Sequence, residues 1–398
     1  MKIRFAFVLS GFALLFVALV VNLYHIQIRS GQGYAVRAAA QVRASGILAP
    51  DRGMITVTDR AGARIPVAIN RSYPSVFAVP AELADVPEAA QQLAAALDLD
   101  PAAVERQLVK PSKYELLAMR VSDDQVAAVR ALDLTGVYVE NVKRRFYPFN
   151  ALAAQVLGFV GPSSSDSDLR GRYGVEAQFE QQLRGTNGAM GETGFTSAID
   201  GSDISLTLDR NIQSRGETLL ADLVKRFKAT GGSVIVQEPT TGRILAMANE
   251  PTFDPNRYGA FPLSTFTDPA VQGIYEPGSV FKVLTMAAGI DSGTFTPETT
   301  IVDKGFLQVG DKKITNWDGK AYGKVTMTEV IERSINTGAA QAARLIGREK
   351  FLGYLERFGI EEKTGIELPG EVAGTLKNLR VKGTEVNLAT AAFGQGVS

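Results

Sequence analysis

The most informative stretch of this chain reads Tyr275-Glu276-Pro277-Gly278-Ser279-Val280-Phe281-Lys282. A Pro-Gly turn followed by apolar residues predicts a helix that begins at Ser279, and we expect its apolar residues from Val280 to Ala287 to be buried. Residues three apart on a helix share one face, so the Ser279 hydroxyl can contact the Lys282 ammonium. At a helix N-terminus, free N–H groups and the helix dipole also favour negative charge that develops on the serine.

Composition limits which side chain could activate Ser279. The sequence contains one histidine, His25, and no cysteine. Ser-His-Asp triads, cysteine nucleophiles and nearly all zinc sites are therefore excluded, and we expect neither a metal nor a cofactor. A nucleophilic Ser279 would instead give its proton to Lys282. The alternative is a chance pairing, because a serine and a lysine stand three apart on many helices.

A second element is Glu332-Arg333-Ser334-Ile335-Asn336-Thr337-Gly338, in which Ser334 lies 52 residues after Lys282. Ser334 supplies a second hydroxyl and Asn336 an amide, and both could face the first pair. The alternative for these two residues is an ordinary turn or helix cap. Together the S-x-x-K and S-x-N elements fit the motif set of penicillin-binding proteins and β-lactamases.

At these residues the chain resembles the class B penicillin-binding proteins, which are peptidoglycan D,D-transpeptidases. Further segments similar to the family follow in the family's order along nearly the whole chain. They are Asp51-Arg52-Gly53, Arg145-Phe146-Tyr147-Pro148, Val156-Leu157-Gly158-Phe159-Val160-Gly161, Tyr173-Gly174-Val175-Glu176, Leu206-Thr207-Leu208-Asp209, Thr241-Gly242-Arg243-Ile244-Leu245-Ala246-Met247, Phe253-Asp254-Pro255-Asn256, Thr364-Gly365-Ile366-Glu367-Leu368-Pro369-Gly370-Glu371 and Gly394-Gln395-Gly396. The lead-in Tyr275-Glu276-Pro277-Gly278 looks more like septal, cell-division members than like side-wall members.

The resemblance implies an α+β chain of several parts. We expect a cytoplasmic tail at residues 1–4, a transmembrane anchor at 5–24, an elongated α/β pedestal (dimerisation) domain at 25–200, and a penicillin-binding transpeptidase domain, an antiparallel sheet with helices, at 201–398. The length of 398 residues also exceeds one average domain, and a hydrophobic content of 45% supports globular cores. Because acidic and basic residues balance at 42 each, nothing in the charge favours a nucleic-acid partner.

The segment from Phe5 to Tyr24 is almost wholly apolar and carries no charge. As a helix it would reach about 30 Å, the thickness of one bilayer core. Lys2 and Arg4 precede it and favour a cytoplasmic N-terminus, with the bulk of the chain outside the bacterial inner membrane. The alternatives are a cleaved signal peptide, using the small residues near Ala38-Ala39-Ala40, and a buried core helix. We favour a single uncleaved span because the run is long for a signal peptide.

Local patterns predict the elements of the two larger domains. Residues 54–58 and 65–68 read as a β-hairpin, and residues 233–237 and 243–247 as a second one. Helical segments lie between residues 87 and 132, where Asp100-Pro101 and Ser122 to Gln125 are start signals. A helical region inserted into β structure suits an interaction module.

The family has a third motif, a K-T/S-G triplet on a strand that lines the cleft. The chain contains Lys363-Thr364-Gly365, but this triplet is part of a segment that in the family is a surface turn and strand, only 29 residues after Ser334. We therefore do not assign Lys363 to the site. The true triplet is expected beyond Ser398, which would leave the transpeptidase domain incomplete, its activity impaired and an apolar sheet edge exposed.

The resemblance implies acyl transfer through a serine ester. Ser279 would attack the penultimate D-alanine of a D-Ala-D-Ala stem peptide, and a neighbouring strand's amine would then take the acyl group. Lys282 would accept the serine proton, Ser334 would relay a proton to the leaving group, and Asn336 would orient Lys282 and the substrate. One oxyanion donor would be the Ser279 N–H. The second belongs to the expected strand beyond Ser398, and losing one donor typically lowers the rate about 100- to 1,000-fold.

Several partners and two other functions follow from the same resemblance. The expected partners are peptidoglycan stem peptides, β-lactams, a SEDS-type glycosyltransferase, and divisome or elongasome proteins. A catalytically defective cell-wall scaffold is one alternative. A serine β-lactamase is the other, although a soluble hydrolase needs neither an anchor nor a pedestal.

Overall fold

The computed structural model describes residues 15–16, 19, 47–48, 50–112, 114–162, 169–191, 194–381 and 385–398. These form two compact units, Met1–Asn150 with Phe179–Thr207, and Ala151–Gln178 with Leu208–Ser398. Each unit has its own cluster of buried hydrophobic residues.

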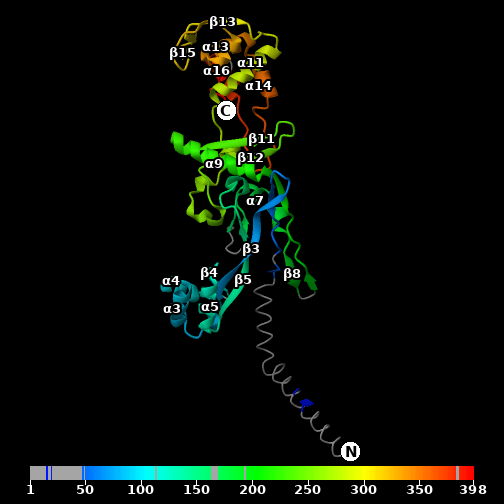
Figure 1. Cartoon of the computed structure of the whole chain (residues 1–398), viewed down its shortest axis with the longest axis vertical. Helices are drawn as coiled ribbons and strands as arrows, with labels where there is room; N and C mark the ends of the chain where they lie inside the picture. The colour runs from blue at the N-terminus through cyan, green and yellow to red at the C-terminus, as the bar shows by residue number, and fades with distance from the viewer. Residues whose placement is uncertain are drawn as a thin grey trace, which may run out of the picture. The chain divides into compact units, whose positions relative to one another are not determined.

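The first unit is built on the long strand β3. Its elements are β1 (Ile47–Leu48), β2 (Ile55–Thr58), β3 (Arg64–Ala78), η2 (Pro80–Glu82), α3 (Val86–Leu97), α4 (Pro101–Leu108), β4 (Glu115–Met119), α5 (Asp123–Ala131), β5 (Val137–Phe146), α8 (Glu180–Arg184), β8 (Gly188–Gly191), β9 (Gly194–Thr196) and β10 (Ile204–Asp209), the last of which runs into the second unit. Strand β3 pairs antiparallel with β4 and β5 (Figure 1) and with β2. Strand β10 continues the sheet beyond β2. A separate small sheet has the order β1-β8-β9.

Helices α3, α4 and α5 form a lobe against one end of this sheet, with Val76 and Ala78 of β3 in its core. Two predicted helix starts are confirmed here. The Asp100 carboxylate accepts from the first N–H groups of α4, and Ser122 and Gln125 form a reciprocal capping box at α5. Hydrogen bonds between residues close in the sequence therefore set where α4 and α5 begin.

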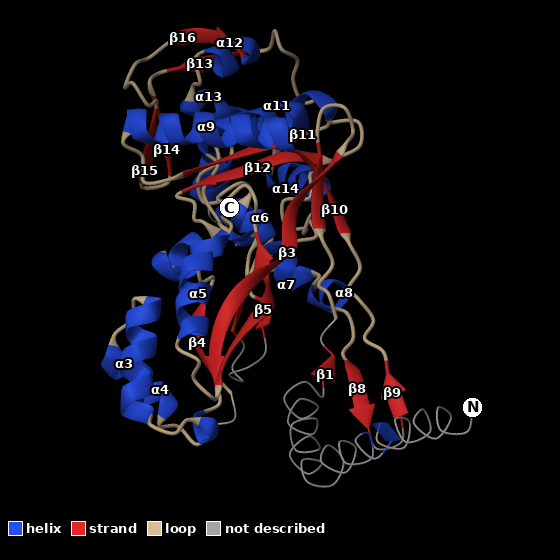
Figure 2. Cartoon of the chain, turned by 60° about the horizontal axis from the view of Figure 1, so that its bottom comes forward, coloured by secondary structure: helices blue, strands red, loops and turns tan. Residues whose placement is uncertain are grey.

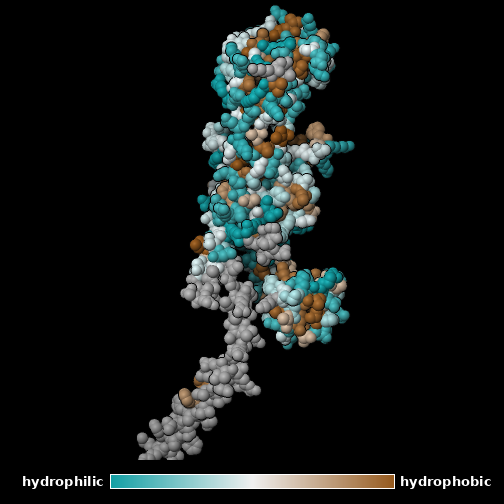
Figure 3. Space-filling model, turned by 180° about the vertical axis from the view of Figure 1, so that it is seen from behind, coloured by the Kyte–Doolittle hydropathy of each residue, from teal (hydrophilic) through white to brown (hydrophobic). Residues whose placement is uncertain are grey.

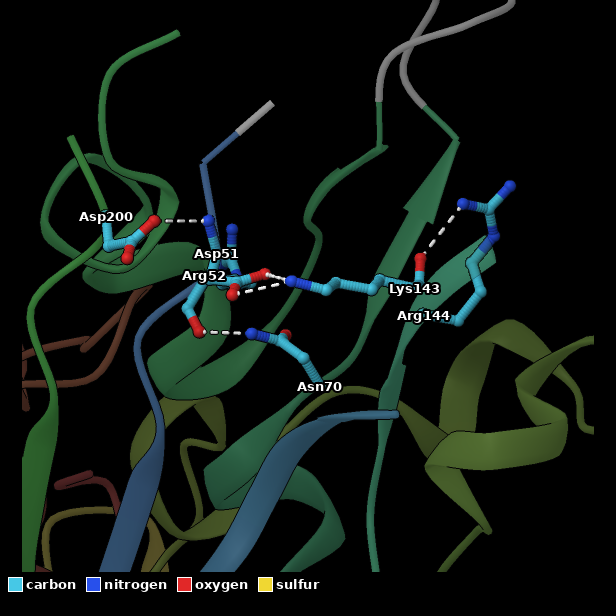
Figure 4. Close-up of polar contacts among 6 residues, drawn as sticks. All are labelled: Asp51, Arg52, Asn70, Lys143, Arg144 and Asp200. Atoms are coloured by element: carbon cyan, nitrogen blue, oxygen red, sulfur yellow. Dashed lines mark hydrogen bonds and ion pairs between the residues drawn. The ribbon is translucent and has the colours of Figure 1, made fainter. Parts of the chain in front are cut away.

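A polar cluster connects the segment just before β2 to parts of the first unit that are distant in the sequence (Figure 4). The Asp51 carboxylate accepts from Lys143 Nζ at 2.6 and 2.7 Å, and the Asp51 N–H donates to Asp200 Oδ1 at 2.7 Å. Asn70 Nδ2 donates to the Arg52 carbonyl at 2.7 Å. Segments almost 150 residues apart in the sequence are thus joined at one point.

The second unit consists of short strands and many helices. Its elements are α6 (Ala154–Leu157), β6 (Val160–Pro162), β7 (Leu169–Gly171), α7 (Gly174–Gln178), α9 (Arg210–Phe227), β11 (Gly232–Gln237), β12 (Ile244–Glu250), η3 (Pro255–Ala260), η4 (Leu263–Thr265), α10 (Pro269–Gln272), η5 (Gly278–Phe281), α11 (Lys282–Asp291), β13 (Thr300–Asp303), β14 (Phe306–Val309), β15 (Lys312–Thr315), β16 (Gly323–Thr326), α12 (Met327–Glu332), α13 (Asn336–Ile346), α14 (Arg348–Arg357), α15 (Lys377–Arg380) and α16 (Glu385–Ala391). The predicted hairpin of β11 and β12 is confirmed, and α9 lies along β12 (Figure 2).

The core of the second unit lies among α11, α13, α14 and α16, which Figure 1 shows gathered together. Helix α13 contributes the small buried residues Ala339, Ala340, Ala342 and Ala343, which let neighbouring helices approach closely. The expectation that every apolar residue after Ser279 is buried is wrong. Phe281 and Met286 are buried, but Val280 and Val283 are 73% and 61% exposed because they lie outside the cluster that Phe281 and Met286 join.

The predicted anchor, Phe5 to Tyr24, lies outside the described residues except for Leu15, Phe16 and Leu19. Within the part of the chain that the structure describes, none of the helices combines the length and apolar character that a membrane span needs.

Candidate active site

Ser279 lies in a 3₁₀ turn that leads directly into a helix. The turn is η5, Gly278–Phe281, and α11 begins at Lys282, so the predicted helix starts with one tighter turn. The Gly278 N–H donates to the Gly394 carbonyl at 3.0 Å, which holds this turn against the chain's last described loop. A Cβ on Gly394 would lie 2.2 Å from the Gly278 oxygen, and its φ is +76°, so glycine is required there.

Lys282 lies at the centre of the site with its side chain only 1% exposed. Its Nζ lies 2.8 Å from both Asn336 Oδ1 and the Ser334 carbonyl oxygen, 3.0 Å from Ser334 Oγ and 3.2 Å from Ser279 Oγ. The structure therefore brings together all four residues that the sequence singled out. Each of these four contacts is to an uncharged oxygen.

Burial has a direct consequence for the protonation of Lys282. Removing the ammonium from water disfavours the charged form, and this lowers the pKa of Lys282 from 10.5 to about 8. A neutral amine has two N–H donors and one lone pair. The Ser334 carbonyl and Asn336 Oδ1 can only accept, so they take the two N–H groups and leave the lone pair for a hydroxyl.

Ser334 has a backbone conformation that few residues adopt. Its φ is +52°, in the left-handed region, although it is not a glycine. The neighbouring Ile335 is fully buried, and its N–H donates to the Val330 carbonyl at 2.9 Å, which anchors the turn. This turn presents both the carbonyl and the hydroxyl of Ser334 to Lys282. Such backbone strain is frequent at functional sites.

The amide of Asn336 has a defined orientation. Its Nδ2 donates to the Thr315 carbonyl at the end of β15 at 3.2 Å, and a carbonyl can only accept. The Oδ1 atom must therefore face Lys282. The contact with β15 thus fixes the amide so that Oδ1, and not Nδ2, faces Lys282.

A cavity of about 600 Å³ opens beside Ser279. Its lining residues are Gly278, Ser279, Trp317, Glu332, Arg333, Ser334, Asn336, Phe393 and Gln395. Sequence reasoning missed Trp317, the single tryptophan, which is 76% exposed at this cavity and precedes an Asp-Gly turn. Nothing in its local sequence signalled proximity to Ser334. Gln395, in contrast, belongs to the Gly394-Gln395-Gly396 segment that the resemblance had marked.

The triplet Lys363-Thr364-Gly365 lies in a loop with no strand. The Thr364 N–H and hydroxyl both donate to Glu371 Oε1 at 2.6 Å, and the hydroxyl holds the pKa of Glu371 below its usual range. None of the three residues lines the cavity at Ser279. In the described residues, no cluster of three or more His, Cys, Asp or Glu side chains is arranged to hold a metal ion.

Comparisons with known families match both units. Residues 232–398 match the penicillin binding protein transpeptidase domain, and residues 47–219 match the penicillin-binding protein dimerisation domain. Stage V sporulation protein D of Bacillus subtilis is 32% identical over 99% of this chain and 62% of its own length. The probable peptidoglycan D,D-transpeptidase PbpC of Pseudomonas aeruginosa is 30% identical over 99% of this chain and 70% of its own length.

A solved structure has the same fold. It is the complex between penicillin-binding protein PBP2 and MreC from Helicobacter pylori, with a TM-score of 0.71 and 21% identity over 88% of this chain and 74% of that one. With both domain matches and the Pseudomonas relative, the chain belongs to the class B penicillin-binding proteins. It spans 62% of the length of the Bacillus subtilis relative.

Proposed function

We propose that this protein is a serine-type peptidoglycan D,D-transpeptidase that binds penicillin covalently at Ser279. One observation carries the proposal: buried Lys282 contacts Ser279 Oγ at 3.2 Å while neutral oxygens of Ser334 and Asn336 hold its amine. The names of the relatives support the substrate class, since the Pseudomonas protein is named a probable peptidoglycan D,D-transpeptidase.

In the proposed reaction, Ser279 Oγ forms a bond to the carbonyl carbon of the penultimate D-alanine and its proton passes to Lys282. The peptide C–N bond then breaks, and the terminal D-alanine leaves with a proton relayed by Ser334. An amine of a neighbouring strand next attacks the ester, Ser279 regains its proton, and a cross-link is formed. Asn336 orients Lys282 and the substrate amide throughout. Each half of the reaction therefore uses the same hydroxyl–amine pair in opposite directions.

The protonation of Lys282 is consistent with this role. Lowering its pKa from 10.5 to about 8 raises the neutral fraction at pH 7 by two to three orders of magnitude. A base whose pKa lies near the working pH combines a useful neutral fraction with a useful driving force for proton transfer. Burial supplies this shift without a second charge.

The test is covalent labelling of the complete gene product by fluorescent penicillin, together with release of D-alanine from a stem pentapeptide. We expect Ser279→Ala to abolish both. Ser292→Ala, at the end of the same helix, and Lys363→Ala, in the rejected triplet, are the matched controls and should keep both activities. Labelling of Ser279→Ala at the wild-type rate would remove the assignment.

The same labelling distinguishes the two alternatives. A β-lactamase would release the penicillin adduct to water in every turnover, whereas a transpeptidase would retain it. A scaffold would form no adduct although it folds. Retention of the adduct together with D-alanine release would exclude both alternatives.

We further propose that the protein is anchored by Phe5 to Tyr24 in the bacterial inner membrane and acts in septal cell-wall synthesis with a SEDS-type glycosyltransferase. The α3–α5 lobe supports a partner-binding role because apolar residues lie at its surface (Figure 3), among them Leu99, Val109 and Met119. The Helicobacter neighbour was solved with MreC, so an elongation role is the competing possibility. Localisation of a fluorescent fusion at the septum or along the side wall decides between the two.

A further inference from the structure

A buried polar cluster lies directly behind Asn336. Its centre is Asp303, at the end of β13, which is 1% exposed. Four groups donate to its carboxylate: Thr337 Oγ1 at 2.6 Å, Gly305 N at 2.8 Å, Asn316 Nδ2 at 2.9 Å and Tyr322 N at 2.9 Å. All four donors are uncharged. Such a network has a defined geometry because each buried polar group that it contains would be destabilising without its partner.

Asn316 connects this cluster to the start of α13. Its Oδ1 accepts from the Thr337 N–H at 3.1 Å, and its Nδ2 donates to the Lys320 carbonyl as well as to Asp303. The residue at the N-cap of α13, Ile335, has no side chain that can cap the helix. Asn316 therefore supplies from outside the helix the acceptor that a polar N-cap residue would otherwise provide.

The cluster fixes both partners of the contact that orients Asn336. Thr315, whose carbonyl accepts from Asn336, immediately precedes Asn316, and Asn336 immediately precedes Thr337. The two residues that follow along the chain, Asn316 and Thr337, are joined to each other and to Asp303. A loosened cluster would let the Thr315 carbonyl and the Asn336 amide move apart.

We propose that Asp303 and Thr337 are positioning residues, which hold Asn336 Oδ1 on Lys282 Nζ and so leave the amine's lone pair to the hydroxyls of Ser279 and Ser334. The inference rests on the proposed function, and it adds two residues that touch neither the cavity nor Ser279 among the described contacts. Their effect on the reaction passes through Asn336.

Removing the acceptor Asn336 Oδ1 has two consequences for Lys282, and they change the acylation rate in opposite directions. An acceptor stabilises the ammonium form, so its loss moves the titration of Lys282 to lower pH. The amine also loses one of the two groups that orient it, so acylation slows even when Lys282 is neutral. The charged groups around the site are Glu332 and Arg333 at the cavity, Asp303 behind Asn336, and Glu276 on the turn before Ser279. The variant Thr337→Val removes none of these four side chains.

The experiment uses Thr337→Val, which keeps the shape and removes the hydroxyl, and Thr337→Ser, which restores the hydroxyl. Thr328→Val is the matched control, because the Thr328 hydroxyl donates to the Pro297 carbonyl on the exposed side of α12. Two readouts are taken on the complete gene product. One is the rate constant of acylation by fluorescent penicillin between pH 6 and 10. The other is the titration midpoint of Lys282 from the ¹³C shift of its Cε, assigned with Lys282→Arg.

We expect Thr337→Val to lower the acylation plateau about 10- to 100-fold and to shift the Lys282 midpoint to lower pH. Thr337→Ser and Thr328→Val should keep the wild-type plateau and midpoint. In an Asn336→Ala background, Thr337→Val should shift the midpoint no further, since the two residues act through one contact. Asp303→Asn serves as the second variant where Thr337→Val folds poorly. Because it also removes a negative charge, its positioning effect is the part of the midpoint shift that disappears in the Asn336→Ala background.

The positioning role would be overturned by an unchanged Lys282 midpoint in Thr337→Val, with an acylation plateau that falls only in proportion to the folded fraction. It would also be overturned if Thr337→Val shifted the midpoint further in the Asn336→Ala background, or if Asp303→Asn shifted it equally with and without Asn336. If wild-type Lys282 titrates as expected and responds to Thr337→Val while Ser279 is never acylated, the proposed function fails and the positioning of Lys282 stands.

Discussion

The polar cluster at Asp51 in the first unit and the one at Lys282 in the second unit treat a lysine ammonium in opposite ways. Lys143 and its partner Asp51 are 60% and 46% exposed, so water and a carboxylate both stabilise the charge. Lys282 is almost fully buried and its hydrogen-bond partners are neutral oxygens. The first arrangement pairs a lysine with water and a carboxylate, and the second makes the neutral amine more accessible.

This difference explains why a carboxylate partner would make Lys282 a poorer general base. An opposite charge within a few ångströms stabilises the ammonium and raises the pKa of a lysine. Neutral acceptors hold the same nitrogen in place with a weaker preference for the charged form. Burial can then lower the pKa of Lys282 to about 8, which is closer to the pH at which a general base works well.

The largest expected effect comes from exchanging each lysine for methionine. Lys282→Met should lower the penicillin acylation rate by several orders of magnitude, because no other amine contacts Ser279 among the described hydrogen bonds. Lys143→Met should leave that rate unchanged. Both rates are measured on the complete gene product by gel fluorescence. Equal losses of the acylation rate in the two variants would contradict a catalytic role that belongs to Lys282 and not to Lys143.

The second prediction concerns the contact that supports the Ser279 turn. Gly394→Ala introduces a Cβ at 2.2 Å from the Gly278 oxygen as well as an alanine at φ +76°. We expect a loss of about 2–4 kcal/mol in the free energy of unfolding and a lower acylation rate. Gly310→Ala is the control, since Gly310 also has a positive φ but open space around its Cβ position. It should lose only about 1 kcal/mol from backbone strain.

The third prediction follows from the pKa of Lys282. Between pH 8 and 10.5 the unfolded chain keeps a proton that the folded Lys282 has already released. The unfolded state therefore binds more protons in this window, and this group's contribution to stability rises with pH. Urea unfolding at pH 7.5 and pH 10 should show wild type gaining stability relative to Lys282→Met. The absence of a gain relative to Lys282→Met would contradict the lowered pKa of Lys282.

The smallest expected effect is at the exposed cluster. Asp51→Asn should lower the free energy of unfolding by at most about 1 kcal/mol, because an exposed ion pair is screened by water and salt. The loss should shrink further in 1 M NaCl. Thermal or urea unfolding at two salt concentrations measures it. A loss of several kcal/mol would show that the Asp51 cluster is a structural requirement of the first unit.

Local sequence patterns predicted much of the fold and the central part of the site. The β11–β12 hairpin, the capped starts of α4 and α5 and the turn before Ser279 each depend on neighbouring residues, and they were predicted. The spacing of Ser279 and Lys282 also fixed their contact, since one helical turn separates them.

Other features of the site depend on contacts that no local pattern encodes. Asp303 meets Thr337 across 34 residues, and Thr315 meets Asn336 across 21. The left-handed conformation of Ser334 depends on the burial of Ile335, which needs the complete core. The exposure of Val280 likewise follows from which residues pack in that core rather than from its own sequence.

The most direct test of Lys282 as the base for Ser279 is the pH profile of acylation at Ser279 by penicillin, followed by peptide mapping of the adduct. We predict that the rate rises with pH to a plateau, with a midpoint near pH 8, and that the adduct is found on the peptide containing Ser279. A rate that is constant from pH 6 to 10, a midpoint above pH 10, or an adduct on another residue would contradict this assignment.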